Sequence, residues 1–137
     1  MTLYIDANVF IFASLFDESD SRTKKAQEIL LSSLSGTQCF TSALTIDEVV
    51  WIWMKQKKNR DEAIKQGLRI HALRNIRILN ITPEISLRSL QLMQKYPQLK
   101  PRDALHAATC MSIGISAIAS DDSDFDAIKE LERIQLQ

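Results

Sequence analysis

Short apolar runs alternate along this chain with longer segments that have the spacing of an amphipathic helix. The runs that we expect to form strands cover residues 3–5, 39–40, 77–81, 115–119 and 133–136. Such alternation is typical of β-α-β units, in which helices connect parallel strands and cover the sheet. The sequence therefore predicts the α/β class, with a short, mostly parallel central sheet flanked by helices.

Three segments between these runs have clear helix signals. Over residues 22–34 the apolar side chains share one face of a predicted helix. This pattern stops before Gly36, which suits a left-handed C-terminal cap. Pro83 and Pro101 each occupy a position typical of the first residue of a helix. Apolar side chains surround most of the helix expected over residues 102–113, so we expect that helix to pack deeply against the sheet.

Length and composition narrow the class of protein. The 137 residues, of which 45% are hydrophobic, suit a single domain over residues 1–137. Three glycines cannot supply a dinucleotide or Walker phosphate loop, and two histidines and two cysteines are too few for a zinc or disulfide framework. We see neither a secretory signal nor an apolar run near the roughly 18 residues of a membrane span, and therefore expect a cytoplasmic protein.

Charge is unevenly distributed although the formal net charge is zero. Residues 55–77 contain eight basic side chains against two acidic ones, and residues 117–132 contain six acidic side chains against one lysine. Such polarity suits a site that holds cations beside a surface that binds an anionic polymer, although solvated helix faces would produce it too.

Acidic residues stand where the predicted strands end. Asp6 closes the first strand, Glu48 follows the second, Asp103 opens the deeply packed helix, and Asp122 and Asp124 follow the fourth strand. Ligands of open α/β sheets bind outside the carboxyl ends of the strands, so we expect these acids to converge on one edge.

Each of these acids also has a purely structural explanation. Asp6 could cap the next helix, Glu48 could complete a capping box with Thr45, and Asp103 could interact with a helix dipole. A cluster of carboxylates, however, repels itself unless a cation lies among them. Because the ligands are all oxygens, we expect Mg²⁺ or Mn²⁺, and with it hydrolysis of phosphodiester bonds.

Four short motifs contain the acids in a definite order. They read IDANV at residues 5–9, EVVW at 48–51, RDALHAA at 102–108 and SDDSDF at 120–125. In this order and strand context the chain resembles the PIN-domain metal-dependent ribonucleases, and more narrowly the VapC-like toxin group. The resemblance extends over residues 4–125, nearly the whole chain.

The resemblance implies a three-layer PIN-like sandwich that cleaves RNA internally with a metal-activated water. It also implies a homodimer and, in toxin members, an antitoxin that blocks the site. Asp6, Glu48, Asp103 and Asp122 would form the catalytic and metal-binding site, and Asp124 would assist as a further metal ligand. Asn8 and Ser120 would position waters, phosphate or the carboxylates themselves. Asp121 falls on a variable position.

Basic and aromatic residues near these motifs have several interpretations. Lys100 and Arg102 stand beside Asp103 and are well placed to meet a substrate phosphate. The basic run over residues 55–60 could steer RNA, although a solvated turn is the more common explanation. Trp51 and Trp53 point to nearly opposite faces of a helix, so one could lie in the core while the other lies at a subunit interface or is simply partly exposed.

His106 follows Asp103 by three residues and could approach the site as a proton donor or phosphate contact. We favour a partly buried packing role for it.

Other functions fit less well. A receiver domain would need paired acids after its first strand, and a haloacid-dehalogenase-type phosphatase would need an acid where Asn8 stands. Two alternatives stay open: an RNA-processing PIN nuclease without an antitoxin, and a non-catalytic PIN-like module that binds RNA or protein.

Overall fold

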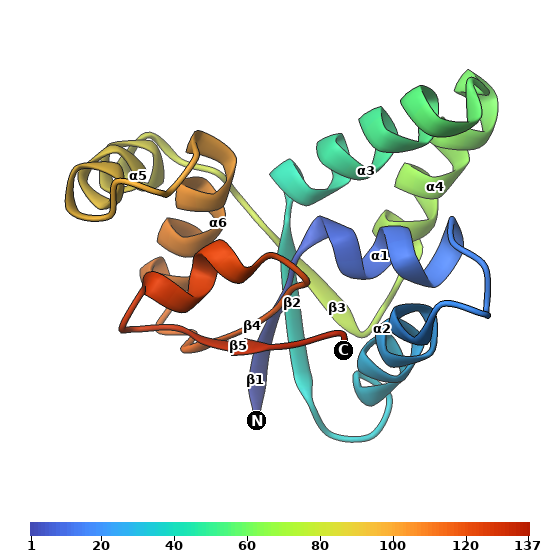
Figure 1. Ribbon diagram of the computed structural model, residues 1–137, viewed down its shortest axis with the longest axis horizontal. Coiled ribbons are helices and arrows are strands. Elements are labelled where there is room, and N and C mark those ends of the chain that lie inside the picture. Colours follow the sequence, from blue (N-terminus) through green and yellow to red (C-terminus); the bar gives the residue numbers. More distant parts are fainter.

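A computed structural model describes all of residues 1–137 and contains six α-helices, one short 3-10 helix and five strands (Figure 1). No helix in it is both long and apolar enough to cross a membrane. The elements follow one another in the order β1 (Thr2–Ile5), α1 (Ala7–Ser14), α2 (Ser21–Ser32), β2 (Gln38–Ser42), α3 (Ala43–Lys57), α4 (Arg60–Ala72), β3 (Ile76–Leu79), α5 (Pro83–Lys95), α6 (Pro101–Ser112), β4 (Ala117–Ala119), η1 (Ser123–Ala127) and β5 (Glu132–Ile134).

The five strands form one sheet in the order β3-β2-β1-β4-β5, and all four strand pairs are parallel. β1 lies at the centre, where Tyr4 is in register with Phe40 on one side and with Ile118 on the other. The predicted α/β class and central parallel sheet are thus confirmed. Because every strand has the same direction, all five carboxyl ends lie at one edge of the sheet.

Helices cover both faces of this sheet. Alternate residues of β1 point to opposite faces, so Leu3 and Ile5 belong to one apolar core and Tyr4 belongs to the other. The first core lies under α1 to α4, and the second lies under α5, α6 and η1. Figure 1 shows the two helical groups on opposite sides of the strands. This is the predicted three-layer arrangement.

The predicted helix boundaries agree with the structure to within about two residues. The Thr82 hydroxyl accepts a hydrogen bond of 3.2 Å from the Ile85 N–H and so caps α5. Gly36 and Gly114 have φ angles of 105° and 72°, the left-handed conformation expected after helices. The strand expected over residues 115–119 begins only at Ala117, because the Ile115 N–H bonds to the Cys110 carbonyl and belongs to the end of α6.

Candidate active site at the carboxyl edge of the sheet

The carboxyl ends of the strands bring together acids that are far apart in the sequence. Asp6 follows β1 directly, Glu48 lies on α3, Asp103 lies in the first turn of α6, and Asp122 and Asp124 follow β4. An open cavity of about 640 Å³ lies at this edge. The residues that line it are Glu48, Lys100, Pro101, Arg102, Asp103 and Asp122.

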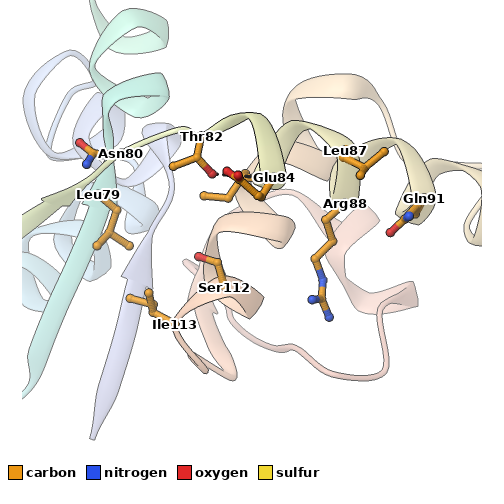
Figure 2. A pocket seen from close by; sticks show the side chains of 10 residues that line it. Leu79, Asn80, Thr82, Glu84, Leu87, Arg88, Gln91, Ser112 and Ile113 are labelled. Atoms are coloured by element: carbon orange, nitrogen blue, oxygen red, sulfur yellow. Dashed lines mark hydrogen bonds between the residues drawn. The ribbon is translucent and has the colours of Figure 1, made fainter.

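Another cavity of about 490 Å³ lies between the end of β3, the start of α5 and the end of α6. Figure 2 shows its lining side chains, among which Glu84 is the single carboxylate. Leucine and isoleucine side chains form much of the rest of its wall. The cavity beside Asp103 and Asp122 is therefore the one whose chemistry suits a cation and a phosphate.

Asp6 is buried, with 5% of its surface exposed, and both of its carboxylate oxygens accept hydrogen bonds. Oδ1 accepts from the Ala7 N–H at 2.7 Å, which caps α1, while Oδ2 accepts from the Ser120 hydroxyl at 2.6 Å and from the Asn8 amide at 3.2 Å. Burial raises the pKa of Asp6 above its usual value, although the His106 charge and the Ser120 hydroxyl act in the opposite direction. Asp6 is thus both a helix cap and a member of the acidic cluster.

Asn8 and Ser120 connect Asp6 to the segment that follows β4. The Asn8 side-chain oxygen accepts from the Asp121 N–H at 3.1 Å, and the Ser120 hydroxyl oxygen accepts from the Asp122 N–H at 3.0 Å. The candidate roles of Asn8 and Ser120 were to position waters, phosphate or the carboxylates. In the structure both side chains donate a hydrogen bond to the Asp6 carboxylate.

Three acids form the open part of the cluster. One carboxylate oxygen from each of Asp103, Asp122 and Asp124 lies within 4.8 Å of the other two. Asp122 also caps η1, because its Oδ1 accepts from the Asp124 N–H at 2.9 Å. Burial, followed by the negative charges of Asp122 and Asp6, raises the pKa of Asp103 to about 7. A set of hard oxygen donors that repel one another in this way fits Mg²⁺ or Mn²⁺.

Glu48 is not part of a capping box. Ser42 is the residue that caps α3, since its hydroxyl accepts from the Thr45 N–H at 3.5 Å, and Thr45 is therefore inside the helix. Glu48 lies further along α3 and lines the acidic cavity. The capping explanation is therefore wrong for this acid.

His106 does more than pack in the interior. It is 1% exposed, as a packing role requires, but its Nε2 lies 2.5 Å from Glu48 Oε1 and 3.4 Å from Asp6 Oδ1. Burial lowers the pKa of His106, but the neighbouring carboxylates of Asp6 and Glu48 raise it further, so the net shift is upward. The preferred interpretation as a packing residue missed these polar contacts. The spacing of three residues from Asp103 was the signal that pointed to them.

The acids thus fall into two groups. Asp6 and Glu48 lie around His106, whereas Asp103, Asp122 and Asp124 face one another. Asp121 belongs to neither group, because its carboxylate pairs with Arg22 at 3.1 Å.

The basic and aromatic candidates have distinct environments. Lys100 and Arg102 are exposed and line the acidic cavity, whereas the basic run over residues 55–60 lies at the exposed turn between α3 and α4. Trp53 is 8% exposed and belongs to the first core, while Trp51 is 57% exposed. One tryptophan in the core is thereby confirmed, and an interface at the other stays a prediction.

The raised pKa of Asp103 predicts how a metal ion would change stability with pH. A carboxyl whose folded-state pKa lies above its unfolded value favours the folded state as pH falls through about 7 and loses that contribution as pH rises. A divalent cation relieves the repulsion among the ionised carboxylates. We therefore expect Mn²⁺ to raise the melting temperature more at about pH 8 than at about pH 6. Thermal denaturation with Mn²⁺ and with EDTA measures this, and equal increases at both pH values would contradict it.

A family model described as PIN domain matches residues 3–131 of the chain. No curated protein gives a significant match. Several solved structures share the fold. The toxin VapC20 of Mycobacterium tuberculosis, described as cleaving the sarcin-ricin loop, is 16% identical with a TM-score of 0.76, and the alignment covers 93% of this chain and 95% of that one.

Two solved complexes also share the fold of this chain. VapBC2 from Rickettsia felis, bound to a promoter DNA fragment, is 15% identical with a TM-score of 0.73 and coverage of 98% of both chains. A toxin-antitoxin complex from Klebsiella pneumoniae is 23% identical with a TM-score of 0.70 and the same 98% coverage of both. At these identities the likeness establishes the fold.

Proposed function

The chain belongs to the PIN-domain family, and from this premise we propose that it is a metal-dependent endoribonuclease and the toxin of a toxin-antitoxin pair. One observation supports this proposal above the others. Five acids from four separate segments gather at the carboxyl edge of the sheet, beside a cavity lined by Lys100 and Arg102. A nuclease needs such acids to bind cations and such bases to bind a phosphate backbone.

The open carboxylates of Asp103, Asp122 and Asp124 would hold Mg²⁺ or Mn²⁺, and Asp6 and Glu48 would complete the acidic site from the interior side. A divalent cation bound there would supply Lewis acidity toward a phosphate oxygen and toward an attacking water. Asn8 and Ser120 would keep the Asp6 carboxylate oriented through their hydrogen bonds of 3.2 and 2.6 Å. Lys100 and Arg102 would hold the scissile phosphate against the acids.

Substitution of Lys100 or Arg102 by alanine is expected to weaken RNA binding in a salt-dependent way. Each lysine or arginine that neutralises a phosphate releases a counterion, so the slope of log affinity against log salt should fall by about 0.7 for each lost contact with single-stranded RNA. Binding titrations at several salt concentrations measure this slope. Lys24→Ala, at an exposed position of α2 that does not line the acidic cavity, is a matched control. An unchanged affinity and slope in the Lys100 and Arg102 variants would remove these residues from the substrate path.

An antitoxin partner is supported by an apolar surface outside the acidic site. An open groove of about 460 Å³ lies between α1, α2, α3 and α4, and seven of its eleven lining residues are hydrophobic. On its rim Leu31 and Leu73 are 61% and 42% exposed. Burial of such side chains stabilises a complex with an apolar peptide segment. A neighbouring open reading frame for a DNA-binding domain with a tail would support the toxin assignment over an RNA-processing nuclease.

A homodimer is supported by exposed leucines on α5. Leu87 and Leu90 are 60% and 57% exposed, and contact with a second copy of the chain would remove their apolar surface from water. We expect light scattering coupled to size exclusion to give twice the monomer mass of 15.6 kDa. Replacement of both leucines by aspartate should give the monomer mass. A monomeric wild-type chain at micromolar concentration would contradict the dimer.

The decisive experiment is cleavage of a mixed-sequence single-stranded RNA by the purified protein with Mg²⁺, with Mn²⁺ and with EDTA. Cleavage that requires the metal would support the nuclease. If folded protein cleaves none of several RNAs but still binds them, the non-catalytic PIN-like module becomes the better explanation.

A further inference from the structure

A buried histidine lies behind the acidic cavity and contacts three elements of the fold. His106, on α6, is within hydrogen-bond distance of Glu48 on α3 and of Tyr4 on β1, and 3.4 Å from Asp6. We propose that His106 is a positioning residue that holds the Glu48 carboxylate in place for metal binding and catalysis. The proposal rests on the nuclease function proposed above, because it concerns the same acidic site.

The contact with Glu48 determines where a ring hydrogen must be. An ionised carboxylate only accepts hydrogen bonds, so Nε2 of His106 has to donate across the 2.5 Å to Glu48 Oε1. This is the sole hydrogen bond that the Glu48 side chain makes with the rest of the protein. The side chain is 21% exposed and borders the cavity, so without His106 it would be free to leave this position.

The other ring nitrogen is anchored in the second core. Nδ1 lies 2.7 Å from the Tyr4 hydroxyl, which in turn lies 2.7 Å from the Ser42 hydroxyl. Hydroxyl groups donate and accept, so this pair can rotate to suit His106 with or without a hydrogen on Nδ1. Tyr4 is completely buried in the centre of the sheet. The ring therefore keeps one orientation, which is the property required of a side chain that positions another.

Two substitutions can distinguish a positioning role of His106 from a packing role. A packing histidine could be replaced by an apolar side chain of similar size, whereas a positioning histidine needs its Nε2–H donor. His106→Leu removes the donor and fills much of the volume. His106→Gln supplies an amide N–H that can reach Glu48. His71, the other histidine of the chain, is exposed on α4, and His71→Leu is the matched control.

The test combines two measurements on the full-length chain. Isothermal titration with Mn²⁺ alone should give an affinity about 10- to 100-fold weaker for His106→Leu than for wild type, with the His71 control unchanged. In RNA cleavage, kcat should fall by a similar factor while KM changes less than about 3-fold. His106→Gln should recover a large part of both losses. Wild-type values in folded His106→Leu, or no rescue by glutamine, would overturn the proposal.

A third measurement needs no variant and keeps the proposal testable if His106→Leu fails to fold. Nitrogen-15 spectra of the wild-type ring should show a protonated Nε2, and an Nδ1–H tautomer with bare Nε2 would overturn the positioning role. The wild-type measurements also separate the two proposals. Absent Mn²⁺ binding and absent cleavage would reject the nuclease, whereas normal wild-type behaviour with an insensitive His106 variant would reject only the positioning role.

Discussion

Replacement of Asp6 by asparagine is expected to lower RNA cleavage by about 1,000-fold or more while the protein stays folded. Asp6 is the acid that connects the two groups of the cluster, because it approaches His106 on one side and raises the pKa of Asp103 on the other. Asparagine is nearly isosteric but neutral, so it removes the charge that a divalent cation would meet. Cleavage assays at saturating RNA with Mn²⁺ measure the effect.

The same substitution should change the stability of the fold far less than it changes the activity. Asparagine caps helices about as well as aspartate, so the bond from the Ala7 N–H to the side chain can persist. The raised pKa of Asp6 means that its ionised form is unfavourable in the metal-free interior. Asparagine also loses the acceptor for the Ser120 hydroxyl and the Asn8 amide, which offsets the relief of the buried charge. We therefore expect Asp6→Asn to keep a melting temperature in EDTA close to that of the wild type and to lose much of the increase that Mn²⁺ gives.

Asp47→Asn is the matched control for this substitution. Asp47 immediately precedes Glu48 on α3 but is exposed and has no contact with the cluster, so its variant should cleave RNA and respond to Mn²⁺ like the wild type. Full activity in folded Asp6→Asn would contradict the assignment of the site. A loss of activity in both variants would indicate a general effect of charge and would contradict it as well.

Local signals in the sequence predicted much of this fold. The apolar runs located all five strands, and Pro83, Pro101 and Gly36 marked helix ends because they act through the adjacent backbone. The acids were predicted to meet because the carboxyl ends of parallel strands share one edge. That inference needs only the direction of the strands, which follows from the helical connections between them.

Contacts that depend on packing between distant elements were not predictable in this way. The spacing of His106 from Asp103 places both on one side of α6, but it does not reveal that Tyr4 and Glu48 lie opposite. Asp121 pairs with Arg22, which lies 99 positions away in the sequence, so this partner was visible only in three dimensions. Side-chain contacts between the layers depend on how the helices pack against the sheet.

The interior and open groups of acids lie in different electrostatic environments. In the interior group, hydrogen bonds from Ser120, Asn8 and His106 replace part of the water that Asp6 and Glu48 lose. In the open group, burial, followed by the negative charges of Asp122 and Asp6, raises the pKa of Asp103 to about 7. A cation bound to the open group would therefore stabilise the folded protein more than a cation bound to the interior group.

Phe125 supports the segment that holds two of these open acids. It is completely buried in η1, directly after Asp124 and within the second core. Phe125→Ala removes most of a large buried side chain and leaves a cavity, so we expect the free energy of unfolding to fall by about 3–5 kcal/mol. Domains of this kind are stable by about 5–15 kcal/mol, so this loss is a large part of the total. Urea denaturation followed by circular dichroism measures it.

The same substitution should also weaken the metal response, because η1 is capped by Asp122 and contains Asp124. In the folded fraction of Phe125→Ala we expect a smaller increase in stability on addition of Mn²⁺ than in the wild type. Phe16→Ala is the control: Phe16 is 43% exposed and stacks on Phe12, so its loss should cost about 1 kcal/mol or less. Equal losses for the two phenylalanines would contradict the role of Phe125 as the anchor. An undiminished Mn²⁺ response in Phe125→Ala would show that Asp122 and Asp124 keep their geometry through the cap of η1 alone.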